Sequence, residues 1–595
     1  MRRRPFIQTA AVVLCIVVVL VFHDVCFPHS EPWQFTYPWS NQAPFSLFRQ
    51  YGNDAPNVHP ILTLIAETED SWHKTRERQS KTLKEAVREY RRRYQMPPPP
   101  NFDRWYEFAK SYGTPLIDEF DSIHDMLTPF WGVDPSIIRA RTVETLGYVD
   151  QNQLWGLQIR NGSVSYTEDG ILPRMIEGFV KWLPDMDLAF NGRDEPRVVL
   201  PNGDLEQLVE RALNKAMPRA KAIRRPINSF TNMTDRLKDK FEKSYRTRFF
   251  QTDKVPLWQA SKISCGVDTA VGNVSGQGVD DVSSYSVGPL NFVRNATAAS
   301  DICNSPSLQS SHGYFVKANP VKISHDLVPV FSPSKISSYA DILIPEPYYY
   351  VHSGYKEEDD TNWSEKNDTI YWRGSTTGGY STNGEWKHQH RQRMVRALNF
   401  TIDGEGVILE RKQIGAGAGW RAKTVSRSNY IGLSDVGFTD MIQCDHMDCE
   451  KQRQEYSIKA WEARSTAFKH RHLLDIDGNA FSGRFYEFLR SKSLVYKVGI
   501  FREWHQDWLW PWVHYIPLSF RFDDGDSGGS DWLETIRFFT SDPVGRKEAK
   551  RLTALKREWA VDTLGKKQME VWLFRLLLEY GRLIDDNRQS IGFWL

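Results

Sequence analysis

The stretch Leu474-Asp-Ile-Asp-Gly-Asn-Ala-Phe-Ser-Gly-Arg-Phe-Tyr-Glu-Phe-Leu489 predicts a strand, a tight turn and a helix in direct succession. A strand-like apolar run ends at Ile476, and the pair Gly478-Asn479 permits a tight turn. Ser482 is a suitable helix cap, after which aromatic and apolar residues recur at helical spacing. Leu494–Val498 has the pattern of the next strand. This order is typical of an α/β fold with a parallel sheet.

The turn between the predicted strand and helix has the features of an anion site. Free backbone N–H groups at such a turn and the positive end of the following helix point at one spot, which suits a diphosphate. Arg484 in the first helical turn adds a forked cation that fits phosphate oxygens. Many α/β folds have a Gly-Asn turn and an arginine that only forms an ion pair, so this pattern alone leaves both roles open.

A second segment, Tyr371-Trp-Arg-Gly-Ser-Thr-Thr-Gly-Gly379, repeats the order of a strand-like start and a small, hydroxyl-rich loop. Arg373 stands at the end of this strand, where ligand sites of α/β folds gather, and Ser375 follows it in the loop. The alternative role of Arg373 is a structural ion pair. Two arginines that each accompany a loop of small residues strengthen the case for anion binding.

The residues on both sides of these segments predict a large α/β body with more than one domain. The chain has 595 residues, 40% of them hydrophobic and 13% aromatic, which is ample for a buried core. Strand-like runs alternate with helix-like stretches from residue 101 onward, and the chain passes from one half to the other near Pro345. We therefore expect an N-terminal half at 101–345 and a C-terminal half with terminal helices at 346–595.

The N-terminus predicts a membrane anchor. Arg2 to Arg4 precede an apolar run over residues 6–22, and no small-x-small cleavage site of a signal peptide follows it. Residues 1–5 are therefore expected to be a cytoplasmic tail, with the rest of the chain in the lumen. Residues 23–100 predict a stem with a charged helix from Ile61 to Tyr94, interpreted as a solvated spacer. The pattern is typical of a single-pass type II protein of the Golgi or another secretory-pathway membrane, with a luminal catalytic part.

Glycosylation sequons and cysteines agree with a luminal body. The simplest pairing in an oxidising lumen is Cys265 with Cys303 and Cys444 with Cys449. The segment Cys444-Asp-His-Met-Asp-Cys449 has a metal site as its alternative, but it offers two thiolates and one histidine at an unusual spacing, so the disulfide is favoured. Seven Asn-x-Ser/Thr sequons predict N-glycosylation at Asn161, Asn232, Asn273, Asn295, Asn362, Asn367 and Asn399.

Both arginine segments resemble glycosyltransferase family 90, which includes fungal capsule-associated transferases, beta-1,2-xylosyltransferases and animal protein O-glucosyltransferases. The aromatic-Arg-Gly-Ser-x-Thr stretch around Arg373 resembles the first arginine motif of the family. The Gly-x-Ala-x-Ser-x-Arg-Phe pattern that ends at Phe485 resembles the second. The resemblance spans roughly residues 88 to 580, and further similar stretches occur at 183–196, 331–342, 492–496, 503–504 and 511–517.

The resemblance implies a GT-B-like fold, in which two Rossmann-like halves face a cleft for the donor and the acceptor. It implies that Arg373 and Arg484 bind the diphosphate of a UDP-sugar donor. The remaining donor-binding residues that it implies are Ser375, Gly478, Asn479, Ala480 and Ser482. The C-terminal half is thus expected to hold most of the donor.

Asp194 matches the catalytic base of the family. An inverting transfer needs one carboxylate that takes a proton from the acceptor hydroxyl as this oxygen attacks the anomeric carbon. Without the resemblance, a surface carboxylate beside Arg193 is the simpler role of Asp194. The resemblance implies no metal requirement, so no metal or other cofactor is expected, and two arginines can supply cations for the leaving diphosphate. Three Asp-x-Asp pairs, a pattern that holds a divalent metal in many glycosyltransferases, are interpreted as chance: Asp185-x-Asp187, Asp475-x-Asp477 and Asp524-x-Asp526.

Together these features predict an inverting glycosyltransferase that moves xylose or glucose from a UDP-sugar to a hydroxyl of a glycan, glycolipid or protein acceptor. One alternative is a protein O-glucosyltransferase that acts on Ser or Thr. Another class of function is a non-catalytic luminal sugar-binding protein, which the presence of Asp194, Arg373 and Arg484 disfavours. No nucleic-acid partner is expected, because 76 basic and 74 acidic residues leave a net charge of only +2.

Overall fold

A computed structural model describes residues 58–595 except 150–151, 169, 234–235, 238–240, 274–277, 353, 400–403, 415–416 and 522–530. The predicted tail at 1–5, the predicted anchor at 6–22 and the first part of the predicted stem lie outside the described residues. The described residues fall within one compact unit, Asn57–Leu595, and this unit has the mixed α/β composition that the sequence predicts.

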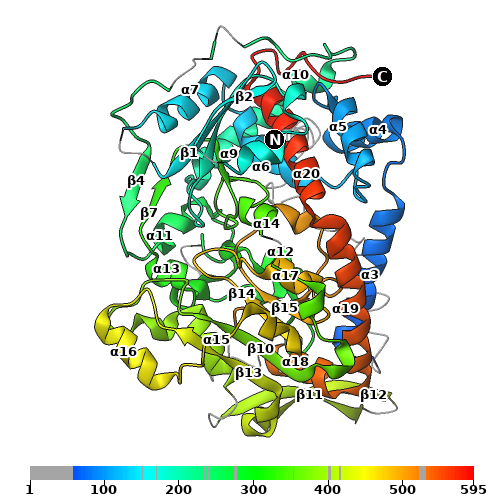
Figure 1. Cartoon of the computed structure of the whole chain (residues 1–595), viewed down its shortest axis with the longest axis vertical. Coiled ribbons are helices and arrows are strands. Elements are labelled where there is room, and N and C mark those ends of the chain that lie inside the picture. Colours follow the sequence, from blue (N-terminus) through cyan, green and yellow to red (C-terminus); the bar gives the residue numbers. More distant parts are fainter. Residues whose placement is uncertain are drawn as a thin grey trace, which may run out of the picture. The chain divides into compact units, whose positions relative to one another are not determined.

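The first of two five-stranded sheets has the order β2-β1-β3-β8-β9 and occupies the upper part of Figure 1. Strand β1 pairs antiparallel with β2 and β3, whereas β3, β8 and β9 are parallel. Every residue of β3 is buried, as expected for a strand that is covered on both faces. The strands are β1 (Leu154–Arg160), β2 (Ser163–Thr167), β3 (Met186–Asn191), β8 (Val330–Ser332) and β9 (Ile342–Leu343).

The second sheet has the order β13-β10-β14-β15-β16, and all of its neighbouring strands are parallel. It lies in the lower part of Figure 1, next to an antiparallel hairpin of β11 (Glu405–Ile414) and β12 (Gly417–Ser426). The strands are β10 (Asn367–Ser375), β13 (Ser434–Asp440), β14 (His470–Ile476), β15 (Leu494–Val498) and β16 (Ile516–Pro517).

The predicted succession of strand, turn, helix and strand is present as β14, a turn, α17 (Phe485–Arg490) and β15. The predicted cap at Ser482 is wrong, because the helix begins two residues later with Arg484 in the N-cap position. The Ser482 carbonyl instead accepts hydrogen bonds from Phe485 N (3.3 Å) and Tyr349 Oη (2.6 Å). The apolar pattern therefore placed the elements correctly, while the hydroxyl of Ser482 does not cap the helix.

The charged segment that was interpreted as a solvated spacer instead packs on the core. It forms α3 (Pro60–Glu77) and α4 (Leu83–Tyr94). Ile61, Leu64 and Ile65 of α3 are buried in the apolar cluster of the second sheet. Trp72 of α3 and Tyr90 of α4 are buried in the larger cluster around the first sheet. Each helix carries one apolar face within its charged sequence, and that face holds it to the protein.

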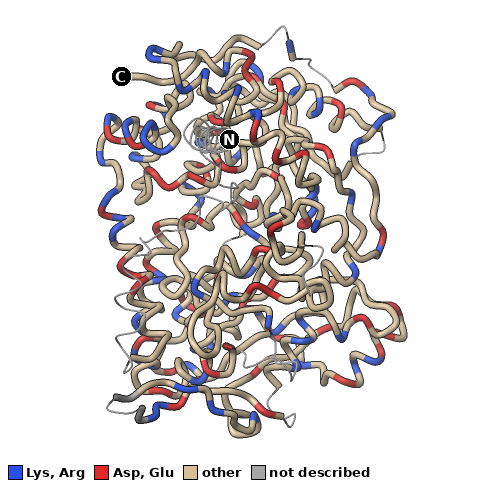
Figure 2. Tube along the Cα trace, turned by 180° about the vertical axis from the view of Figure 1, so that it is seen from behind, with Lys and Arg blue, Asp and Glu red and all other residues tan. Residues whose placement is uncertain are grey.

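Two arginines of the basic run Arg91–Arg93 in α4 are paired within the protein. Arg93 lies 2.7 Å from Glu89, 2.9 Å from Glu119 and 3.1 Å from Asp121. Arg92 also pairs with Glu89, at 2.7 Å. Basic and acidic residues are interspersed over the described part of the chain (Figure 2), as the balanced composition predicts.

The two C-terminal helices contact elements in and around both five-stranded sheets (Figure 1). Helix α19 (Pro543–Thr563) contacts α17 and β15, whereas α20 (Lys566–Ile584) contacts four helices that surround the first sheet. Those four are α5 (Phe102–Ser111), α6 (Asp121–Trp131), α7 (Pro135–Leu146) and α8 (Leu172–Ile176). The chain thus returns to its N-terminal elements after the second sheet is complete.

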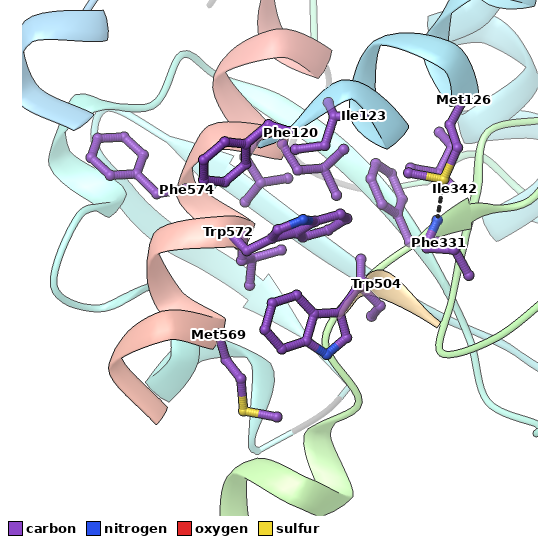
Figure 3. Close-up of a cluster of buried hydrophobic side chains, with 14 of the residues drawn as sticks. Phe120, Ile123, Met126, Phe331, Ile342, Trp504, Met569, Trp572 and Phe574 are labelled. Atoms are coloured by element: carbon purple, nitrogen blue, oxygen red, sulfur yellow. Dashed lines mark hydrogen bonds between the residues drawn. The ribbon is translucent and has the colours of Figure 1, made fainter. Parts of the chain in front are cut away.

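Side chains of α20 fill the core beside α6 (Figure 3). Trp572 lies among Phe120, Ile123 and Trp504, with its ring 5.7 Å from that of Trp504. Met126 Sδ accepts a hydrogen bond from Leu343 N at 3.2 Å, which ties α6 to the edge strand β9. Full burial of each such side chain contributes about 1.5–3 kcal/mol, so this cluster is a main source of stability for the first sheet.

The prediction of a single-pass type II protein of a secretory-pathway membrane is contradicted. Among the described residues, no helix is both long enough and apolar enough to cross a bilayer. The long helices α3, α19 and α20 reach 18, 21 and 19 residues, but charged side chains recur along each of them. The run at 6–22 lies outside the described residues.

The two predicted cysteine pairs are both disulfides. Cys265 and Cys303 have Cα atoms 5.4 Å apart, and so do Cys444 and Cys449. The alternative of a metal site at 444–449 is therefore wrong, because both thiols are joined to each other. Six of the seven sequon asparagines are exposed, whereas Asn295 is partly buried and caps α12 (Ala296–Ala299) by accepting from Ala298 N.

Candidate functional site

The two predicted arginine segments meet at one edge of the second sheet. Strands β10 and β14 are parallel neighbours, with Tyr371 opposite Leu473, so the loops that follow them leave the same edge. Two contacts join these loops. Arg484 Nη1 donates to Arg373 O at 2.5 Å, and Asn479 Oδ1 accepts from Gly378 N at 3.1 Å. We call this region the arginine edge, defined by residues 373–379 and 477–484.

Arg373 is held at the end of β10 by carboxylates and a ring. Its Nη2 lies 2.8 Å from Asp435 Oδ1 and 3.5 Å from Glu462 Oε1. Its guanidinium carbon lies 4.7 Å from the centre of the Tyr371 ring. The Nε atom is buried and has no hydrogen-bond partner among the described residues. The structural ion pair that the sequence left open is thus present, and it leaves one donor of Arg373 unused.

The positive charge of Arg484 has fewer protein partners than that of Arg373. Its guanidinium makes one hydrogen bond among the described residues, to the Arg373 carbonyl. Burial lowers the pKa of Arg484, and the negative charge of Asp475 opposes that shift. An arginine keeps its proton at neutral pH even so, and a partly buried cation with few partners favours an anionic ligand.

Arg391 is a third cation at this edge, and no sequence motif predicted it. It lies in the first turn of α15 (His390–Leu398) and is buried. Its Nε donates to Asp477 O (2.8 Å), and its Nη1 donates to Ser375 O (3.0 Å) and Thr377 Oγ1 (2.6 Å). Burial and, to a smaller extent, the positive charge of Arg484 lower its pKa to about 9. The one sequence signal for this residue is the His- and Arg-rich run 388–393 after the first loop.

The turn after β14 is held closely against Arg391 and the first loop. A Cβ atom at Gly478 would lie 3.0 Å from Arg391 Nη2, so glycine permits this approach. Asn479 Oδ1 also accepts from Asn319 Nδ2, at 3.0 Å. Ala480 and Ser482 are buried, so their side chains lie in the interior of the protein. Helix α17 has only six residues, which makes the arginines rather than a helix end the main source of positive charge.

Asp194 follows strand β3 of the first sheet and is exposed. Protein atoms around its carboxylate raise its pKa, Arg193 opposes the rise, and the remaining contact with water screens the shift. The next residue, Glu195, is buried, and burial together with the charge of Asp194 raises its pKa to about 7. The structure thus places two neighbouring carboxyl groups with raised pKa values where the sequence predicted one base.

Hydrogen bonds connect the Asp194 segment to the arginine edge. Ser334 Oγ donates to Asp194 O at 3.2 Å. The next residue, Lys335, pairs with Arg502 through two main-chain hydrogen bonds of 3.0 and 2.7 Å. Phe501, beside Arg502, donates through its backbone N to Asp477 Oδ2 at 3.4 Å. The predicted base and the predicted donor segment are therefore linked through one short, described path.

The Asp-x-Asp pairs have protein partners where the structure describes them. Asp187 lies 2.6 Å from Arg160, and Asp475 lies 3.0 Å from Lys497. Within the described part of the chain, no three His, Cys, Asp or Glu side chains are grouped to hold a metal ion. The pair Asp524-x-Asp526 lies outside the described residues.

A surface pocket of about 350 Å³ lies elsewhere, between α3 and α4. Its lining contains both acidic and basic side chains, among them Arg78, Glu85 and Arg88, and it shares no residue with the arginine edge. A pocket of mixed charge is a poor match for a diphosphate, whereas three converging arginines suit one. The chemistry therefore places the candidate site at the arginine edge.

Comparison with protein families matches one segment of the chain. The model described as Glycosyl transferase family 90 matches residues 316–590. This range contains Arg373, Arg391 and Arg484, and Asp194 lies before it. The match confirms the resemblance that the arginine motifs predict. Comparison with curated proteins finds no match.

Proposed function

Residues 316–590 of this chain match the model of glycosyl transferase family 90, a family of glycosyltransferases, and from this premise we propose a specific reaction. The protein transfers xylose or glucose from a UDP-sugar to a hydroxyl of a glycan acceptor, with inversion at the anomeric carbon. The observation that carries the proposal is the convergence of Arg373, Arg391 and Arg484 at one edge of a parallel sheet.

The arginines serve the leaving group. As the bond between the anomeric carbon and the diphosphate oxygen breaks, negative charge develops on UDP, and preorganised cations in a site of low dielectric stabilise that charge. Arg484 has free donors for phosphate oxygens, and Arg373 offers its Nε. Because the three cations supply this stabilisation, the proposed reaction needs no metal ion.

Asp194 serves the nucleophile. Its carboxylate takes the proton from the acceptor hydroxyl while that oxygen bonds to the anomeric carbon from the face opposite UDP. A raised pKa makes a carboxylate a stronger base, which suits proton transfer near neutral pH. The neighbouring Glu195 has a pKa of about 7, so it supplies a second carboxyl group that is partly protonated at neutral pH.

The two sheets fit the two halves of a GT-B-like fold. The second sheet is parallel throughout and carries the arginines, so we assign it to the donor half. Asp194 follows strand β3 of the first sheet, so we assign this sheet to the acceptor half. Support for this arrangement is the path from Asp194 through Ser334, Lys335 and Arg502 to the arginine edge.

The test is release of UDP by the purified full-length protein. We expect turnover with UDP-xylose or UDP-glucose that increases when a hydroxyl acceptor is added and persists in EDTA. Restriction to UDP-glucose with Ser- or Thr-containing peptides as acceptors would identify a protein O-glucosyltransferase instead. Absence of UDP release from both donors, with and without acceptors, would contradict an enzyme and favour a sugar-binding protein.

A further inference from the structure

Asp477 is the residue at which three segments of the donor half meet. It directly precedes the Gly478–Ser482 turn and is 1% exposed. Its main-chain oxygen accepts from His390 Nε2 (2.9 Å) and Arg391 Nε (2.8 Å), both in the first turn of α15. Its Oδ2 atom accepts from the backbone N of Ile500 (2.7 Å) and of Phe501 (3.4 Å), after β15. Four donors from two other segments thus converge on this residue.

A pair of buried histidines faces the same residue. The rings of His312 and His390 stack with centres 4.0 Å apart and an angle of 7° between their planes. Backbone N–H groups of Tyr314 and Gly313 donate to their Nδ1 atoms, which places the hydrogen of each neutral ring on Nε2. Burial lowers the pKa of both rings, that of His390 to about 3. His312 Nε2 therefore presents an N–H toward Asp477 Oδ2, at 4.0 Å.

The carboxylate of Asp477 is closed off from a metal ion by its neighbours. Its partner in the Asp-x-Asp pair, Asp475, bonds instead to Lys497. A Cβ atom at Gly499 would lie 2.6 Å from Asp477 Oδ1, so the backbone at Gly499 packs directly on that oxygen. The two carboxylates have separate protein partners, and Asp477 Oδ1 is buried without a hydrogen-bond partner among the described residues. Asp477 is thus built into the interior as an acceptor of main-chain hydrogen bonds.

We propose that Asp477 is a positioning residue of the donor site, which holds the Gly478–Ser482 turn in register with α15 and with the segment after β15. The proposal rests on the proposed function. A metal ligand would show its carboxylate to solvent or to a second acidic residue, whereas this carboxylate faces backbone amides. Asp477 therefore has a structural role, and it affects donor binding through the position of the turn and of Arg391.

The test compares two substitutions at one position. Asp477→Asn keeps an oxygen for the amides of Ile500 and Phe501, and Asp477→Ala removes it. Burial raises the pKa of Asp477 to about 7, so a neutral amide is a close substitute near neutral pH. We expect Asp477→Ala to raise the donor KM about tenfold with kcat changed less than about threefold, and Asp477→Asn to stay within about threefold of the unaltered protein in both. An equal loss in both variants, with manganese lowering the KM of the unaltered protein, would identify a metal ligand and overturn the proposal.

Gly499→Ala tests the same role by changing a residue that packs against the Asp477 carboxylate. Its Cβ atom would displace the Asp477 carboxylate, so we expect the donor KM to rise as in Asp477→Ala. Gly203→Ala in α9 (Asn202–Arg211) is the matched control, because a Cβ atom there meets nothing within 4 Å. If Asp477→Ala does not fold, an unchanged donor KM in Gly499→Ala overturns the proposal.

Calorimetric titration with UDP separates this proposal from the proposed function. Failure of the unaltered protein to bind UDP would contradict the proposed function itself. Equal UDP affinity in the unaltered protein, Asp477→Ala and Gly499→Ala would contradict the positioning role alone. Thermal unfolding of each variant shows whether a loss of affinity comes from the turn or from global destabilisation.

Discussion

Arg484 Nη1 donates a hydrogen bond of 2.5 Å to the main-chain oxygen of Arg373. The bond joins two segments that each carry an arginine and that are 111 positions apart in the chain. It fixes the position of the Arg484 guanidinium relative to the end of β10. The positive charge of Arg484 also lowers the pKa of Arg391, and like charges held near each other raise the free energy of the empty site. A bound diphosphate relieves that repulsion, so the same arrangement that costs stability favours the donor.

Arg484→Ala is expected to weaken UDP binding about 10- to 100-fold, since charged hydrogen bonds to a phosphate are worth about 1.5–3 kcal/mol. Arg484→Lys keeps the charge but loses the fork and should recover only part of the affinity. Calorimetric titration with UDP measures both. An unchanged affinity together with a lowered kcat would assign Arg484 to the reaction step rather than to the donor.

Arg391→Lys is expected to raise the donor KM about tenfold, because one ammonium cannot replace three hydrogen bonds that span Asp477, Ser375 and Thr377. Arg396→Lys is the control on the same helix, since Arg396 is exposed and pairs with Glu455. Initial-rate kinetics across donor concentrations provide the measurement. Equal effects of the two substitutions would show that Arg391 has no specific role at the arginine edge.

Asp194→Asn is expected to lower kcat about 10²- to 10⁴-fold while UDP affinity stays the same, because the amide cannot accept the proton of the acceptor hydroxyl. Asp204→Asn on the exposed side of α9 is the control. Rates of sugar transfer and calorimetric UDP affinity are measured on the same preparations. A variant that keeps its activity would remove Asp194 from the role of base.

Glu195→Gln is expected to change how stability depends on pH. Burial raises the folded-state pKa of Glu195 to about 7 from an ordinary value of 4.5, so between these pH values the folded chain holds a proton that the unfolded chain releases. The free energy of unfolding therefore falls as the pH rises through this window, by about 3 kcal/mol at most.

Urea unfolding of both proteins between pH 4.5 and 8 tests this sign. The stability of Glu195→Gln relative to the unaltered protein should increase with pH across the window and level off above it. Parallel curves for the two proteins would mean that Glu195 has the same pKa in the folded and the unfolded chain.

Local pattern allowed the strand, turn and helix around residue 478 to be predicted, because apolar periodicity and turn residues act over short distances. The predicted cap at Ser482 is wrong because the helix begins later, with Arg484 in the N-cap position, and Tyr349, far away in sequence, holds the Ser482 carbonyl outside the helix. Arg391 was missed because its importance comes from loops of two other strands, which only the folded sheet brings together. The packing of α3 could not be predicted for the same reason, because its apolar face contacts residues that lie hundreds of positions away in the chain.

The cysteine pairs could be predicted because few alternatives existed, and both are present. The roles of Asp194, Arg373 and Arg484 stay predictions, which the substitutions above test. Glu195 gave no sequence signal beyond its position beside Asp194, since its raised pKa depends on burial by segments distant in the chain.

The return of α20 to the first sheet has a consequence for biosynthesis. Trp572 and Phe574 complete a core whose other members include Phe120 and Ile123, so the N-terminal layer lacks part of its interior until the last helix has been translated (Figure 3). Contacts of such long sequence separation slow folding and leave apolar surface exposed on the nascent chain. A ribosome that pauses before residue 566 therefore holds a chain whose first sheet is a substrate for chaperones, and loss of the final helix would damage the segment that was made first.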